Sequence, residues 1–244
     1  MLSKTEAIVL HTIKYGERKI IVDMFTRQHG RLSFVVPLPK SVHGKLKKQY
    51  FQPLSLLTIE CDIKPQAQLQ KLHDAAILTP LSSLLCDPTK LSISLFLSEF
   101  LYHALKGEQQ NTALFDYVLS SILWLDNRER DYANFHLVFL MRLSRFLGFY
   151  PNLQERGQTV YFDLRAASFC AAPPLHRDFL MPEEACMLKL MMRMDYSNLH
   201  LFRMNRQQRN RCIEVALLFY RLHLPDFPDL RSLEVLRELW DPLL

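Results

Sequence analysis

The hydrophobic pattern of this chain changes its period once, at Pro80. Before Pro80, short runs rich in Ile, Val, Phe and Thr alternate with turn residues, a pattern typical of β-strands. These runs cover residues 7–13, 20–26, 32–36, 54–63 and 68–78. Five short strands within the first 80 residues favour a small barrel, because closing the sheet leaves no strand edge unpaired.

Beyond Pro80 the apolar residues recur with the spacing of helices. Asn111 can cap one helix, Gly148 and Pro151 supply a helix stop after residues 132–147, and Pro182 can open another helix. We therefore predict an α+β protein. An N-terminal five-stranded OB-type β-barrel occupies residues 1–80, and a mainly α-helical domain, with an irregular insertion at about 151–181, occupies residues 81–244.

The composition fits a folded chain, because 49% of the 244 residues are apolar and only 23% are charged. The longest apolar run has six residues, at 215–220, far short of the roughly 20 that a membrane-spanning helix needs. The first residues are too polar for a secretory signal, and the five cysteines form no CxxC pair. We expect a cytoplasmic, nucleoid-associated protein with reduced thiols.

The excess positive charge lies in the first third of the chain. Residues 1–80 contain 12 Lys and Arg against 6 Asp and Glu, whereas residues 81–244 contain 18 against 19. The basic stretch at residues 40–50 contains Lys40, Lys45, Lys47 and Lys48, which could neutralise phosphates. The aromatic side chain of Tyr50 beside them could stack on a base, as could those of Tyr15, Phe34 and Phe51. A cationic module on a near-neutral body indicates a polyanionic partner.

No local motif indicates catalysis. The chain has no phosphate-binding glycine loop, no HExxH and no GxSxG, although an active site assembled in space would leave no such motif. Cys170, His176 and Cys186 lack the close ligand pairs of structural zinc sites, which favours free thiols and no metal. We expect a protein that is not an enzyme and has no cofactor.

Two groups of arginines in the helical part could meet acidic partners. Arg203, Arg206, Arg209 and Arg211 stand near the start of a long helix, where cations oppose the helix dipole. Either an acidic partner or the chain's own carboxylates could neutralise them. Arg142 and Arg145 interrupt an apolar helix and could hold the carboxylate of a partner's tail or form internal salt bridges.

Several motifs along the chain resemble those of the RecO family of bacterial DNA repair proteins. The segment TEAIVLHTIKYGE at residues 5–17 is similar to the family's "VL-x-T-x-x-YGE" opening, and residues 25–32 are similar to its "FT-x-x-xG-x-L" hairpin. The LGFYP sequence at residues 147–151 resembles the family's "LG-x-x-P" at the end of the central helix. The order of elements agrees along nearly the whole chain.

The resemblance implies a DNA repair and recombination mediator with an OB-fold and a helical domain. Such proteins bind single- and double-stranded DNA, anneal complementary strands, and with RecR help to load RecA onto strands coated by single-stranded DNA-binding protein, whose acidic tail they also bind. The DNA-contacting face of the family corresponds here to Lys14, Arg18, Lys19, Arg27, Arg31, Lys40, Lys45, Lys47 and Lys48.

The chain departs from the family in one segment. Many members have a four-cysteine zinc element after the "LG-x-x-P" motif, whereas residues 152–162 here contain no cysteine. We expect a degenerate element in which Tyr161, Phe162, Leu164 and Phe169 form an apolar cluster instead.

Two other functions fit the same pattern. The first is an OB-type RNA-binding factor acting in translation, which would prefer structured RNA to single-stranded DNA. The second is a helical protein-interaction adaptor with a merely structural barrel, which would bind no polyanion at physiological salt.

Overall fold

A computed structural model describes residues 2–38, 46–154 and 160–238 of the chain. These residues pack into two compact units. The first unit spans Met1–Asn127 with Leu230–Leu239, and the second spans the segment Arg128–Asp229. Strands and helices therefore meet inside the first unit, although the change from strand to helix falls near residue 80.

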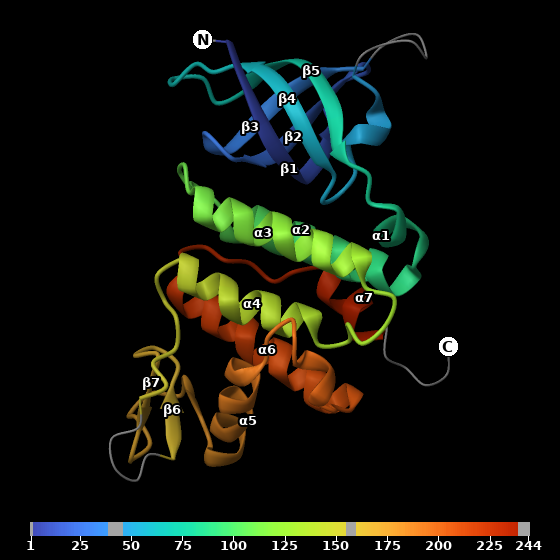
Figure 1. The fold of residues 1–244 in the computed structure, drawn as a ribbon. Helices are drawn as coiled ribbons and strands as arrows, with labels where there is room; N and C mark the ends of the chain where they lie inside the picture. The colour runs from blue at the N-terminus through green and yellow to red at the C-terminus, as the bar shows by residue number, and fades with distance from the viewer. Residues whose placement is uncertain (1, 39–45, 155–159, 239–244) are drawn as a thin grey trace. The chain divides into compact units, whose positions relative to one another are not determined.

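A closed five-stranded barrel forms the first part of unit 1, as predicted (Figure 1). Its strands are β1 (Leu2–Lys14), β2 (Lys19–Thr26), β3 (Gly30–Pro37), β4 (Leu56–Asp62) and β5 (Gln70–Thr79). The order around the barrel is β1-β2-β3-β5-β4, in which only β3 and β5 run parallel. A 3-10 turn, η1 (Lys48–Phe51), lies between β3 and β4 in the chain.

Strand β1 is buried on both faces, which explains its unbroken apolar run. Ala7 and Val9 point into the barrel core with residues such as Phe34. Because side chains alternate along a strand, Ile8 and Leu10 lie on the other face, and both are buried too. That face packs against helix α2 (Pro88–Ala104), as a hydrogen bond of 2.5 Å from Ser98 Oγ to the Leu10 carbonyl oxygen shows.

Three more helices complete unit 1: α1 (Ser82–Cys86), α3 (Thr112–Asn127) and α7 (Ser232–Glu238). Asp87 caps α2 by accepting hydrogen bonds from two backbone amides. Asn111 Oδ1 accepts a hydrogen bond from the Leu114 amide at the start of α3, which is the capping that the sequence predicts. Helix α7 packs against α2.

Unit 2 contains α4 (Phe135–Phe146), α5 (Pro182–Arg193), the 3-10 turn η2 (Leu199–Leu201) and α6 (Arg206–His223). Asn205 and Gln208 form a capping box at the start of α6. Tyr220 of α6 is fully buried and donates a hydrogen bond of 2.7 Å to the Leu140 carbonyl oxygen of α4, so the two helices are fixed together.

The predicted irregular insertion contains a small sheet. Its strands are β6 (Tyr161–Asp163), β7 (Ser168–Cys170) and β8 (Phe179–Leu180), in the order β7-β6-β8. These strands have two or three residues each, too few for a period of two to be recognised in the sequence.

Candidate nucleic-acid interface

The turn between β1 and β2 carries three cations. Lys14, Arg18 and Lys19 are all exposed at this turn. Gly16 adopts a φ of 70°, which an L side chain rarely tolerates, and the Tyr15 amide donates a hydrogen bond of 2.9 Å to the Lys19 carbonyl oxygen. The closed turn thus holds the cations together at the end of the barrel where β1 ends.

The end of β3 reaches the same turn. The Leu38 amide donates a hydrogen bond of 2.9 Å to the Arg18 carbonyl oxygen. Lys40 and Lys45, two further predicted contacts, lie outside the described residues. Leu38, the last described residue before them, therefore lies beside the β1–β2 turn.

The η1 segment is also attached to the end of β1. Thr12 Oγ1, two residues before Lys14, donates a hydrogen bond of 3.0 Å to the Phe51 carbonyl oxygen. Lys47 and Lys48 are exposed in this segment, whereas Tyr50 is half-buried and packs on the barrel core. The hydrogen bonds thus connect both cationic segments to the last residues of β1.

Five of the predicted cations are available to a ligand, and they come from these two segments: Lys14, Arg18, Lys19, Lys47 and Lys48. Within the described residues, none of the five forms an ion pair. We name these five residues the cationic end of the barrel. The exposed carboxylate of Glu17 lies in the same turn but forms no ion pair with them within the described residues. Five cations against this one carboxylate give a surface suited to bind phosphates without reading sequence.

Arg27, in contrast, has partners inside the fold. Its Nε lies 2.7 Å from Glu6 Oε2 and its Nη1 lies 2.5 Å from Asp116 Oδ1 of α3. Partial burial alone would lower the pKa of Arg27, but the hydrogen bonds to both carboxylates raise it. The guanidinium also lies 4.7 Å from the centre of the Phe115 ring, so its charge fastens the barrel to α3.

Arg31 has a similar internal role beside α2. Its guanidinium donates a hydrogen bond of 2.6 Å to the Tyr102 carbonyl oxygen. The guanidinium also lies 4.3 Å from the centre of the Tyr102 ring. Asp23 Oδ1 is 3.6 Å from its guanidinium. Burial raises the pKa of Asp23, but hydrogen bonding to His11 and Ser33 outweighs it, and the pKa is lowered overall.

The start of β5 and the turn before it carry two exposed lysines that were not among the predicted contacts. Lys64 lies in the turn between β4 and β5, and Lys71 lies at the start of β5, opposite Val35 of β3. Val35 in turn pairs with Ile21 of β2, and both are half-buried. Lys71 of β5, Val35 of β3 and Ile21 of β2 therefore lie side by side across three strands. This arrangement could be found only once β3 and β5 were known to be neighbours.

The four arginines of α6 and the preceding segment have different surroundings. Arg203 is exposed and Arg206 is half-buried. Arg209 is buried, donates to Asn134 Oδ1 at 3.1 Å, and has a pKa lowered by that burial.

Arg211 is paired with acidic side chains of its own unit. Its Nη2 lies 2.6 Å from Glu184 of α5, and its Nη1 lies 3.2 Å from Glu214 on the same helix. The four arginines of this group therefore do not share one open surface.

The two arginines of α4 also differ. Arg142 lies 3.7 Å from Asp195, which is an internal ion pair. Arg145 is exposed and lies 6.0 Å from the centre of the Tyr150 ring.

The segment expected to replace a zinc element has an apolar interior. Phe162 and Phe169 pack edge to face with ring centres 4.9 Å apart, and Leu164 is fully buried. Tyr161 is half-buried and packs against Phe179. Among the residues that the structure describes, no three potential metal ligands of the His, Cys, Asp or Glu type come together.

Comparison with known proteins identifies the family. A family model described as "Recombination protein O N terminal" matches residues 1–81, and one described as "Recombination protein O C terminal" matches residues 85–234. The chain belongs to the RecO family. It is thus a RecO-type DNA repair and recombination protein, as the motifs indicated.

Its RecO relatives match along almost their whole length. The chain is 50% identical to "DNA repair protein RecO" of Phocaeicola vulgatus over 98% of its own length and 100% of the relative. It is 49% identical to RecO of Bacteroides fragilis and 33% identical to RecO of Porphyromonas gingivalis, in each case over 99% of the chain and 100% of the relative. The names of these relatives and of both family models describe DNA repair and recombination.

In the described parts of the chain, no helix combines the length and the apolarity needed to cross a membrane.

Proposed function

We propose that this protein binds single-stranded DNA at the cationic end of the barrel and anneals complementary strands. The observation that carries the proposal is the convergence of five exposed, unpaired cations from two segments at the end of β1. Two phosphate backbones repel each other, and neutralising them on one surface lets complementary bases meet. No covalent chemistry is required.

The same surface gives a role in recombination. A protein that holds a single strand by its phosphates leaves the bases available, so a recombinase can take over the strand. We infer that the protein, together with RecR, helps to load RecA onto strands coated by single-stranded DNA-binding protein. Double-stranded DNA shares the phosphate chemistry and is a second ligand of the cationic end.

Unit 2 offers cations to an acidic protein partner. Arg145 and Arg203 are exposed and form no ion pair among the described residues, whereas Arg142 and Arg211 are paired with carboxylates. We infer that Arg145 and Arg203 are the better candidates for contact with the acidic tail of single-stranded DNA-binding protein.

The test is an annealing assay with fluorescently labelled complementary strands, naked or coated with single-stranded DNA-binding protein, over a series of salt concentrations. Annealing is expected to be faster with the protein and to slow steeply as salt rises. Binding of the protein releases counterions from the DNA, and added salt opposes that release. A rate that is independent of salt would contradict the proposal. Stronger binding of structured RNA than of single-stranded DNA would favour a function in translation instead.

A further inference from the structure

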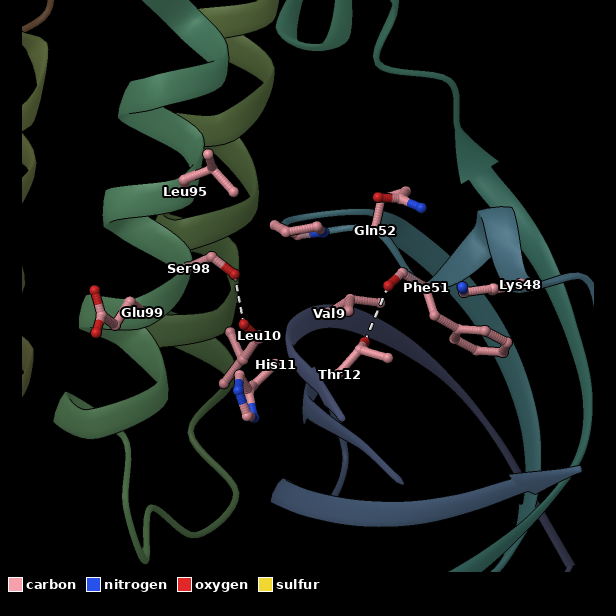
Figure 2. A pocket seen from close by; sticks show the side chains of 11 residues that line it. Val9, Leu10, His11, Thr12, Lys48, Phe51, Gln52, Leu95, Ser98 and Glu99 are labelled. Atoms are coloured by element: carbon pink, nitrogen blue, oxygen red, sulfur yellow. Dashed lines mark hydrogen bonds between the residues drawn. The ribbon is translucent and has the colours of Figure 1, made fainter. Parts of the chain in front are cut away.

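A cavity of about 440 Å³ lies beside the cationic end of the barrel (Figure 2). It is open on one side and is lined by the last part of β1, the η1 segment with the residues after it, and one face of α2. Leu95 of α2 lies across the cavity from Gln52 and Lys48 of the η1 side. The volume falls within the range of about 300–1,000 Å³ that is usual for small-molecule sites.

The walls combine apolar surface with groups that form hydrogen bonds. Leu10, Leu95 and Pro53 supply apolar surface. Thr12 Oγ1 donates its proton to the Phe51 carbonyl oxygen, so its lone pairs remain able to accept. The Gln52 side chain is exposed and makes no hydrogen bond within the described residues, so its amide can both donate and accept. A flat ligand with apolar faces and a polar edge fits such a lining.

Lys48 connects this cavity to the proposed DNA surface. It is one of the five residues of the cationic end and also lines the cavity. A strand whose phosphate lies on Lys48 therefore passes the opening of the cavity with its bases within reach. In a duplex the bases are stacked and paired, and moving one out costs a few kcal/mol, whereas a single strand largely avoids this cost.

We propose that the cavity accepts one unstacked nucleobase of a single DNA strand whose phosphates lie on Lys47 and Lys48. This inference depends on the proposed function, because it requires a strand at the cationic end. The Gln52 amide can turn to suit the edge of any base, so the site tolerates different sequences while it favours single strands over duplex.

Two matched substitutions on α2 separate this cavity from its surroundings. Leu95 lines the cavity and is 40% exposed, so the larger side chain of Leu95→Trp should fill the cavity. Leu95 also borders a neighbouring apolar groove of about 350 Å³, which Leu91 borders as well. Leu91 is 37% exposed and does not line the cavity, so Leu91→Trp is the control for effects on the groove and on the helix. Thermal unfolding verifies that both variants are folded.

The measurement compares two DNA oligonucleotides of twelve nucleotides with equal numbers of phosphates, one of thymidine and one of abasic tetrahydrofuran residues, by fluorescence anisotropy. Wild type is expected to bind the thymidine strand about tenfold more tightly, the effect of one well-held base. Leu95→Trp should reduce this ratio to about threefold or less, while Leu91→Trp keeps it and all three proteins keep the same dependence on salt.

Equal ratios for Leu95→Trp and Leu91→Trp, or a wild-type ratio near one, would overturn the base pocket while leaving phosphate binding intact. Failure of wild type to bind either strand would overturn the proposed function and the pocket together. A strand with one 5-iodouracil provides an independent readout. Its photocrosslinks should map to residues 9–12, 48–53 or 95–99, and crosslinks confined to other residues would contradict the proposal.

Discussion

Removal of the three cations of the β1–β2 turn should lower the salt dependence of DNA binding in proportion to the number of cations removed. The variant Lys14→Gln/Arg18→Gln/Lys19→Gln replaces three exposed side chains that have no ion pair within the described residues. Each phosphate contact on a single strand contributes about 0.7 to the slope of log K against log salt, so the slope should fall by about 2. At 0.1 M salt this corresponds to about 100-fold weaker binding, or about 2.7 kcal/mol.

The control for this variant is Arg27→Gln, which also removes a positive charge from the barrel. Arg27 is paired with Glu6 and Asp116, so its loss should lower the free energy of unfolding by about 1–2 kcal/mol. The slope for DNA binding should not change. The triple variant should show the opposite pattern, with unfolding free energy within about 0.5 kcal/mol of wild type, because its side chains are exposed.

Binding is followed by anisotropy of a labelled thymidine strand between 50 and about 300 mM salt, the range in which such slopes are usually resolved, and stability by urea unfolding. The reasoning is refuted if the triple variant keeps the wild-type slope. It is also refuted if Arg27→Gln lowers the slope by the same 0.7 per charge, because an arginine paired with two carboxylates of its own fold would then count as a DNA contact.

Three further predictions concern stability. Gly30→Ala should destabilise unit 1 by several kcal/mol in urea unfolding, because φ is 69° and a Cβ would lie 2.3 Å from the Glu108 carbonyl oxygen; wild-type stability would contradict this close approach. Burial alone would raise the pKa of Glu99, but hydrogen bonds from Ser232 and from the Arg231 amide lower the pKa overall. The contribution of Glu99 to the free energy of unfolding should therefore be fully present at neutral pH and be lost as pH drops below 4.5, the ordinary pKa of this carboxyl group. Glu99→Gln should remove this part of the acid dependence, and an unchanged pH profile would count against it. Phe162→Ala should cost about 3–5 kcal/mol of local stability in unit 2, which hydrogen exchange of β6 and β7 would detect as lost protection.

The sequence predicts the strands and helices well where one face or both are apolar. The run at residues 7–13 lies within β1, which in fact begins at Leu2 because its polar first residues pair with β4. Asn205 marks the start of α6 by its capping side chain, and Gly148, with a φ of 86°, follows the end of α4. Such signals depend on neighbours in the chain and can be read locally.

What the sequence could not reveal depends on contacts between distant residues. Nothing near Arg27 in the chain distinguishes it from Arg18, yet Asp116, which neutralises Arg27, is 89 positions away. The cavity beside η1 likewise requires β1 and α2 to be neighbours. Basic residues could therefore be recognised as candidates, but their separation into structural and exposed groups needed the fold.

The central claim is that a DNA strand lies on the cationic end of the barrel. Lysine acetylation footprinting with mass spectrometry, with and without a thymidine strand, tests it directly. Lys14, Lys19, Lys47 and Lys48 are expected to be protected by the DNA, while Lys4, which faces Glu60 at 3.8 Å, reacts equally in both samples. Equal reactivity of the four lysines with and without bound DNA would contradict the account.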